Sequence, residues 1–150
     1  MAEDYKRPEW DEYFLNIAEE VGKRSTCLRR RYGAIIVKDN IIVSTGYNGS
    51  PRGEINCLDA KVCERERLNI PKGERYELCK SVHAEQNAII NGDPLKMQGA
   101  TIYIVGINVA DGSYASGEPC LLCRRMIKNA QISKVVCRNP QGEISEVPIA

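Results

Sequence analysis

The sequence predicts a single three-layer α/β/α domain over residues 1–150, with helices on both faces of a mixed β-sheet. Three observations lead to this fold class. Two β-branched runs flank a short polar turn, helix-like segments then alternate with further strand-like runs, and 150 residues are enough to bury one core. A hairpin pairs antiparallel whereas a strand–helix–strand crossover pairs parallel, so both kinds of pairing are expected in one sheet.

The composition excludes several classes of protein. There are 21 Lys and Arg against 20 Asp and Glu, a formal net charge of +1, which argues against a long nucleic acid as partner. The apolar runs, such as residues 34–37, are far shorter than the roughly 20 residues that span a bilayer, and the first residues lack the basic-then-apolar pattern of an export signal. We therefore expect a cytoplasmic protein with no membrane partner.

The first 47 residues are predicted to form a helix and then a hairpin. Apolar residues recur with helical spacing over about residues 9–23, and Pro8 stands where a first helical turn tolerates proline. The β-branched runs 33–38 and 41–47 are separated by the polar pair 39–40, which is typical of a two-residue hairpin.

The middle of the chain shows no regular periodicity. Residues 48–80 are rich in glycine, proline and charge, and they contain three cysteines. A structureless stretch of this length is uncommon in a compact domain, so we expect it to be functional, cross-linked or partly helical around residues 58–68.

The second half of the chain alternates helices and strands, and Ser81 is a suitable N-cap for the first of them. The predicted elements are a helix over about 82–91, a strand over 101–105, a helix over about 120–130, a strand over 133–137 and a short strand over 143–149. Because only 13 residues follow Cys137, the last strand is expected to return antiparallel or to be missing.

The candidate site combines two motifs at helix starts. His83 is the single histidine of the chain and precedes Glu85 by two residues, while Pro119 precedes the pair Cys120 and Cys123. An imidazole and two thiolates are three ligands for a catalytic zinc ion with a fourth position for water, and a helix start favours thiolates. We predict that these three residues bind zinc and that Glu85 moves protons beside it, which is the signature of zinc-dependent nucleobase deaminases.

Each motif alone has simpler interpretations. A C-x-x-C pair also occurs in structural zinc sites and redox centres, and a His-Ala-Glu triplet is ordinary helix sequence. Their joint occurrence at two helix starts, with a strand between them, favours deamination of a cytosine-type ring.

Across roughly residues 8–140 the sequence resembles the deoxycytidylate (dCMP) deaminases of the cytidine deaminase superfamily. Residues 46–51 (GYNGSP) are similar to the GYNG-x-P substrate loop of that family, and residues 82–89 (VHAEQNAI) to its catalytic helix. The resemblance implies a cytidine deaminase-like fold and conversion of a small nucleotide, dCMP, to dUMP and ammonia. It also implies that Asn48 orients the nucleotide and that Arg52 faces its 5′-phosphate.

The same resemblance implies further metal and subunit contacts. Cys27, Cys57 and Cys79 fall where some members of the family carry ligands of a second, structural zinc ion, and Cys63 would supply a fourth sulfur. The alternative is that these are free thiols, which are commonly buried, as we expect for Cys137. Family members commonly form symmetric homo-oligomers, often hexamers.

Residues 108–118 form a longer stretch than in the shortest family members, with Tyr114 near the middle. It either lays this aromatic ring over the pocket or forms a surface loop.

Two other functions compete with dCMP deamination. The substrate could be another cytosine-type molecule, such as a free nucleoside or a modified pyrimidine. A catalytically inactive, zinc-stabilised binding protein is a third interpretation, but a structural zinc site would have a fourth ligand and no need of Glu85.

Overall fold

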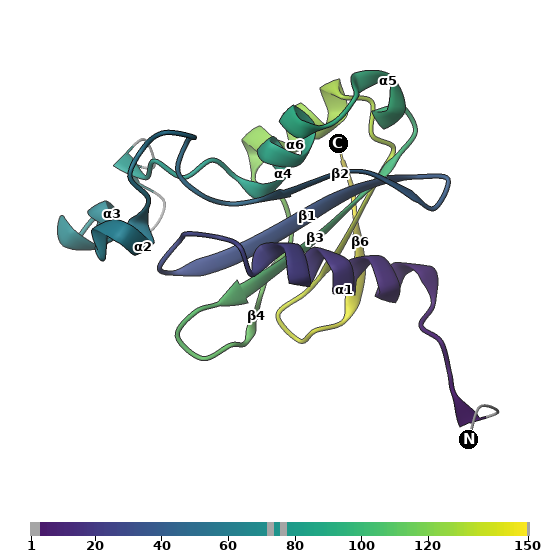
Figure 1. Cartoon of the computed structure of the whole chain (residues 1–150), viewed down its shortest axis with the longest axis horizontal. Helices are drawn as coiled ribbons and strands as arrows, with labels where there is room; N and C mark the ends of the chain where they lie inside the picture. Colours follow the sequence, from purple (N-terminus) through teal and green to yellow (C-terminus); the bar gives the residue numbers. More distant parts are fainter. Residues whose placement is uncertain (1–3, 72–73, 76–77, 150) are drawn as a thin grey trace.

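The computed structural model describes residues 4–71, 74–75 and 78–149. Figure 1 shows helix α1 (Trp10–Gly22) against one face of a β-sheet, with α4 (Ala84–Asn91) and α6 (Leu121–Asn129) on the other side. The sheet has six strands in the order β2-β1-β3-β5-β6, and β4 pairs with β3. The strands are β1 (Arg30–Lys38), β2 (Ile41–Tyr47), β3 (Thr101–Asn108), β4 (Tyr114–Ala115), β5 (Lys134–Arg138) and β6 (Ile144–Val147).

The sheet is mixed, as predicted. The pairs β1–β2, β1–β3 and β5–β6 are antiparallel, whereas β3 and β5 are parallel and are joined through α6. The last strand returns antiparallel, in agreement with the short sequence left after Cys137. The three-layer α/β/α fold class is thus confirmed.

The hairpin turn explains why β1 and β2 pair where the sequence predicts. Asp39 and Asn40 have φ angles of 52° and 61°, so both adopt the left-handed conformation of a type I′ turn. Aspartate and asparagine tolerate this conformation better than most residues, because their short polar side chains bond locally.

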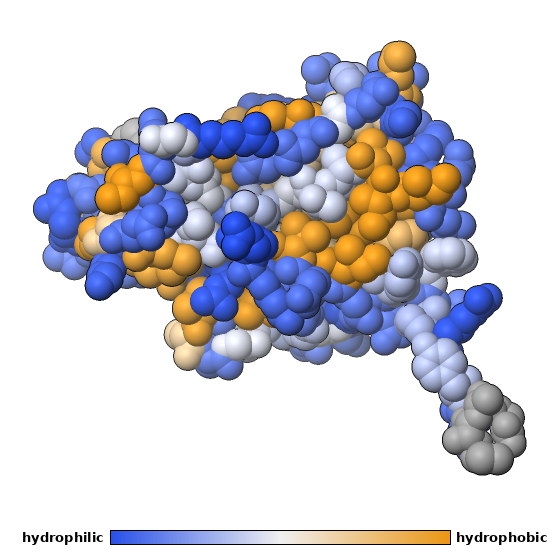
Figure 2. All heavy atoms as spheres, in the orientation of Figure 1, coloured by the Kyte–Doolittle hydropathy of each residue, from blue (hydrophilic) through white to orange (hydrophobic). Residues whose placement is uncertain are grey.

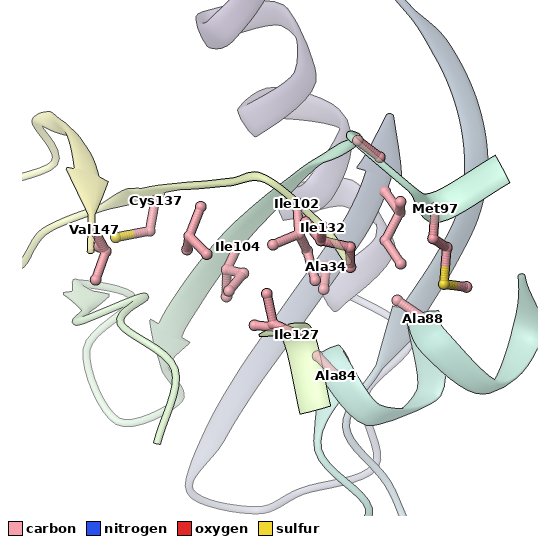
Figure 3. Close-up of a cluster of buried hydrophobic side chains, with 13 residues drawn as sticks. Ala34, Ala84, Ala88, Met97, Ile102, Ile104, Ile127, Ile132, Cys137 and Val147 are labelled. Atoms are coloured by element: carbon pink, nitrogen blue, oxygen red, sulfur yellow. The ribbon is translucent and has the colours of Figure 1, made fainter. Parts of the chain in front are cut away.

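Alternation along the strands divides the core into two clusters. Ala34 and Ile36 of β1 belong to the cluster under α4 and α6, while Ile35 and Val37 belong to the cluster under α1. Figure 3 shows Ala84 and Ala88 of α4 and Ile127 of α6 in the first of these clusters. Small alanine side chains let α4 approach the sheet closely.

Helix α4 begins two residues later than predicted, and its N-cap is His83 rather than Ser81. Val82 pairs with Gly49 of the loop after β2 through two backbone hydrogen bonds of 2.7 and 3.1 Å. This pairing holds Val82 extended, so the helix can start only after it. The Gln86 side chain then accepts the backbone N–H of His83 at 2.8 Å.

Short helical turns occupy places that periodicity predicts only in part. Helices α2 (Cys57–Ala60) and α3 (Glu64–Arg67) lie within the region expected to be partly helical. Helix α5 (Pro94–Met97) and strand β4 were not predicted, since elements of two to four residues carry no periodic signal. Within the described part of the chain, every helix is too short or too polar to cross a bilayer.

Candidate active site

Helices α4 and α6 bring the predicted zinc ligands together. His83 is the N-cap of α4, Cys120 is the N-cap of α6, and Cys123 lies in the first turn of α6. The Nδ1 atom of His83 lies 3.3 Å from Sγ of Cys123 and 3.6 Å from Sγ of Cys120. All three ligand atoms lie within 4.8 Å of one another.

These distances fit a tetrahedral zinc ion. Bonds of about 2.3 Å to sulfur and about 2.0 Å to nitrogen place the two kinds of atom about 3.5 Å apart at a tetrahedral angle. The observed separations of 3.3 and 3.6 Å lie on either side of that value. The Nδ1 atom, rather than Nε2, faces the sulfurs, and a set of three protein ligands is the composition of a catalytic zinc site.

Burial controls the protonation of the Cys123 side chain. Burial is the main cause that raises the pKa of the Cys123 thiol, and the nearby Glu85 charge raises it further. The helix start was expected to favour the thiolate, but for this residue desolvation outweighs that effect. Metal binding at Cys123 is therefore coupled to release of a proton.

Glu85 lies beside the three ligands and is not one of them. Its side chain is 6% exposed, and burial raises the pKa of its carboxyl group, partly offset by a backbone hydrogen bond and the charge of His83. The neighbouring Cys123 side chain lowers the pKa of this carboxyl group, and Glu85 raises the pKa of the Cys123 thiol. The structure thus places a buried carboxylate beside a ligand, which is the position that a proton-transfer group requires.

The loop after β2 is held against the site by a glycine and an asparagine. A Cβ atom on Gly46 would come 2.3 Å from the backbone nitrogen of Ala88, so α4 passes directly over this glycine. Asn48 is 7% exposed. Its Oδ1 accepts the Tyr32 N–H at 2.8 Å, and its Nδ2 donates to the Arg30 carbonyl at 3.0 Å. Among the described residues these are its side-chain hydrogen bonds, so one N–H and one lone pair are available to another partner.

Arg52 lies away from the three ligands. Its exposed guanidinium donates a 3.1 Å hydrogen bond to Oδ1 of Asn91, the last residue of α4. The ligand His83 lies at the other end of this helix, as its N-cap. Asn91 in turn donates to the Thr45 carbonyl of β2 at 3.0 Å. Sequence reasoning missed Asn91, although its spacing of eight residues from His83 places it at the opposite end of the predicted helix.

The other predicted zinc ligands lie in one region without forming a closed site. The backbone N–H of Leu58 bonds to the Thr26 carbonyl at 3.2 Å, which joins the segments that carry Cys57 and Cys27. Burial raises the pKa of Cys57, and the charges of Cys27, Cys63 and Cys79 raise it further. Among the residues that the structure describes, however, no three of these four sulfurs lie within 4.8 Å of one another.

Tyr114 does not cover the site, which excludes one of the two alternatives for residues 108–118. Tyr114 and Ala115 pair with Ile107 and Gly106 as strand β4, which fixes the stretch to the sheet. The Tyr114 hydroxyl donates to Glu19 at 2.7 Å, and its ring packs with the cluster under α1, on the face opposite the three ligands. Cys137 is 1% exposed and belongs to the core, as predicted.

Comparisons with known proteins agree with this geometry. The model of the cytidine and deoxycytidylate deaminase zinc-binding region matches residues 8–139. The deoxycytidylate deaminase of Mycobacterium phage D29 is 39% identical, over 87% of this chain and 94% of that protein. The enzyme of the same name from Schizosaccharomyces pombe is 35% identical, over 87% of this chain but only 37% of that protein.

Solved structures support the same assignment. The crystal structure of dCMP deaminase from cyanophage S-TIM5, in complex with dCMP and dUMP, aligns with a TM-score of 0.62 and 29% identity. The alignment covers 90% of this chain and 85% of that one. Cytidine deaminase from Burkholderia pseudomallei shares the fold at a TM-score of 0.56, which confirms the expected cytidine deaminase-like architecture. From its matching family model, its relatives and its site, the chain belongs to the cytidine and deoxycytidylate deaminase family.

Proposed function

We propose that this chain catalyses zinc-dependent hydrolysis of dCMP to dUMP and ammonia. The observation that carries the proposal is the meeting of His83, Cys120 and Cys123 beside the buried carboxylate of Glu85. Relatives of similar sequence from phage and yeast are named deoxycytidylate deaminases, which supports dCMP over other cytosine-type substrates. The presence of Glu85 argues against an inactive binding protein, because a purely structural zinc site does not need a proton-transfer group.

The residues of the site divide the work of this reaction. His83, Cys120 and Cys123 would hold zinc, which when bound lowers the pKa of a water ligand to about 7. Glu85 accepts a proton from the attacking water and delivers it to the ring nitrogen of the base. The carboxylate then takes the remaining proton of the former water from the new hydroxyl group on the ring carbon and delivers it to the amine. The carbon–nitrogen bond breaks as the carbonyl forms, so that water is consumed and ammonia leaves.

A substrate panel tests the assignment. Purified zinc-loaded protein should release ammonia from dCMP faster than from CMP, deoxycytidine or cytosine. Release from deoxycytidine at a rate equal to that from dCMP would reassign the enzyme to free nucleosides.

For substrate contacts, we propose that the free amide N–H of Asn48 orients the nucleotide and that Arg52 binds its 5′-phosphate. Replacing Arg52 with alanine should then raise KM for dCMP about 10-fold or more, because a hydrogen bond to a charged group contributes about 1.5–3 kcal/mol. Steady-state kinetics on dCMP and deoxycytidine measure this effect, and activity on deoxycytidine should not change. Arg67→Ala is the matched control, since this exposed arginine pairs with Glu64. An unchanged KM for dCMP in Arg52→Ala would remove the phosphate role.

We also propose that Cys27, Cys57, Cys63 and Cys79 bind a second, structural zinc ion. Sγ of Cys27 accepts a hydrogen bond from the Arg29 N–H at 3.4 Å, so a backbone donor already faces this sulfur. A zinc ion held by all four sulfurs would connect Cys57, Cys63 and Cys79 to the segment between α1 and β1, which carries Cys27.

Metal analysis distinguishes the two interpretations of these cysteines. The intact protein should contain two zinc ions per chain, and Cys57→Ser should contain one and unfold at a lower temperature, because a structural zinc ion adds its binding energy to folding. Cys137→Ser serves as the control for zinc content, because it removes a core cysteine that is not a proposed ligand and should leave two zinc ions per chain. One zinc ion per chain in the intact protein would exclude the second site.

We further propose that the protein is a cytoplasmic homo-oligomer, with a hexamer as the expected form. Seven free cysteines suit a reducing compartment. Exposed leucines beside the site, Leu121 and Leu122 of α6, suit contact with another copy. Figure 2 shows further apolar side chains beside α1, near the end of the β1–β2 hairpin, where Ile41 is 70% exposed. Light scattering should give a multiple of the 16.8 kDa chain mass, and a monomer would contradict this.

A further inference from the structure

Tyr32 is an aromatic residue near the site that takes no part in the proton transfers or in zinc binding. It lies in β1, and its side chain packs against the cluster under α4 and α6 that also contains Ala84, the residue between His83 and Glu85. Its backbone exchanges two hydrogen bonds with Asn48, from the Tyr32 N–H to Oδ1 at 2.8 Å and from the Asn48 N–H to the Tyr32 carbonyl at 3.3 Å. Tyr32 is therefore fixed to the residue proposed to orient the nucleotide.

The Tyr32 ring packs against the backbone of the neighbouring strand, β3. Gly106 of β3 is the register partner of Tyr32. A Cβ atom on Gly106 would come 2.3 Å from Cε1 and 2.7 Å from Cδ1 of this ring, which no real side chain tolerates. The ring thus lies over the backbone of β3, and glycine at position 106 is required for it to do so.

The Tyr32 ring lies on the face of the sheet that carries the site. Side chains alternate along β1, so Tyr32 shares the face of Ala34 and Ile36, which α4 and α6 cover. Burial is the main cause that raises the pKa of the Tyr32 hydroxyl, Arg30 lowers it, and the charge of Glu85 raises it, in agreement with this placement. An aromatic ring on the same face as the proton-transfer group, with its backbone bonded to the substrate loop, suits a flat base, because stacking on an aromatic side chain stabilises any base.

We propose that the Tyr32 ring forms the surface against which the pyrimidine ring of the substrate lies, between Asn48 and Glu85. Tyr32 is then a residue that positions the base for attack. This inference rests on the proposed function, since it names the contact that dCMP and dUMP make in the same site.

Replacements at position 32 test this role through binding as well as turnover. Tyr32→Val keeps a β-branched residue suited to a strand but removes the ring, whereas Tyr32→Phe removes only the hydroxyl. Calorimetry should show the Kd for dUMP rising about 10-fold in Tyr32→Val and staying within about twofold of the original in Tyr32→Phe. KM for dCMP should follow the same order, with zinc content unchanged.

Tyr114→Val is the matched control, because Tyr114 is a partly buried tyrosine of the same sheet on the opposite face. It should lose stability without a change in the Kd for dUMP.

If Tyr32→Val does not fold, Gly106→Ala displaces the same ring and should raise the Kd for dUMP similarly. An unchanged Kd in a folded variant of either kind overturns the inference, whereas no turnover of dCMP by the unaltered enzyme overturns the proposed function instead.

Discussion

Replacing Glu85 with glutamine should abolish most of the deaminase activity while leaving the zinc content unchanged. Glutamine has nearly the same shape, but its amide cannot accept a proton from water and deliver it to the base. Loss of general acid–base catalysis lowers turnover by about 10²–10⁴-fold. Stopped assays of ammonia release, together with metal analysis of the same sample, measure both quantities.

Gln86→Ala is a control for this variant, because Gln86 is the next residue of α4 and bonds only to the His83 backbone in the described structure. It should reduce stability modestly and keep turnover within the same order of magnitude. Full activity in Glu85→Gln would mean that another group moves the protons.

Replacing Cys123 with alanine should remove both the catalytic zinc and the activity. Cys123 is fully buried, so no other side chain from solvent can take its place as a ligand. A site with one imidazole and one thiolate binds zinc far more weakly than a site with three ligands. Zinc per chain should fall by one, and turnover of dCMP should fall below detection.

Cys137→Ala separates loss of a ligand from loss of packing. Cys137 is also a buried cysteine, in β5, and burial raises its pKa to about 11, so it stays a thiol. This variant should lose some stability and keep its zinc and its activity. Equal zinc content in Cys123→Ala and the unaltered protein would exclude Cys123 as a ligand.

The sequence predicts this fold well where local and long-range preferences agree. The pair Asp39-Asn40 accepts the left-handed turn, and the flanking strands alternate between two cores, so the hairpin follows from neighbouring residues. The start of α4 depends instead on pairing between Val82 and Gly49, which are 33 positions apart. A local N-cap preference for Ser81 cannot reveal such a contact.

In the site, too, some features follow from the sequence and others depend on long-range strand pairing. His83, Cys120 and Cys123 meet because α4 follows β2 and α6 follows β3 and β4, and β2 and β3 finish at the same end of the sheet, where both pair with Gly33 of β1. The sequence leaves the position of Tyr114 open between two alternatives, because nothing local shows that its strand pairs with β3. Strand pairing decides which face of the sheet a side chain occupies, and one residue of register reverses that face.

Arg52 and Tyr32 show where side-chain geometry adds most. The sequence places Arg52 in the substrate loop, but only the structure shows its bond to Asn91 at the far end of α4. The sequence does not single out Tyr32. Only the structure shows that its ring lies over Gly106 and that its backbone N–H bonds to Asn48.

A crystal structure of the zinc-loaded protein, with anomalous scattering recorded at the zinc edge, tests the arrangement of the site most directly. We expect a zinc ion about 2.0–2.3 Å from Nδ1 of His83 and from the sulfurs of Cys120 and Cys123. Its fourth ligand should be a water molecule that donates a hydrogen bond to Glu85. A zinc ion bound directly by the Glu85 carboxylate, or absent from these three atoms, would contradict the proposed chemistry.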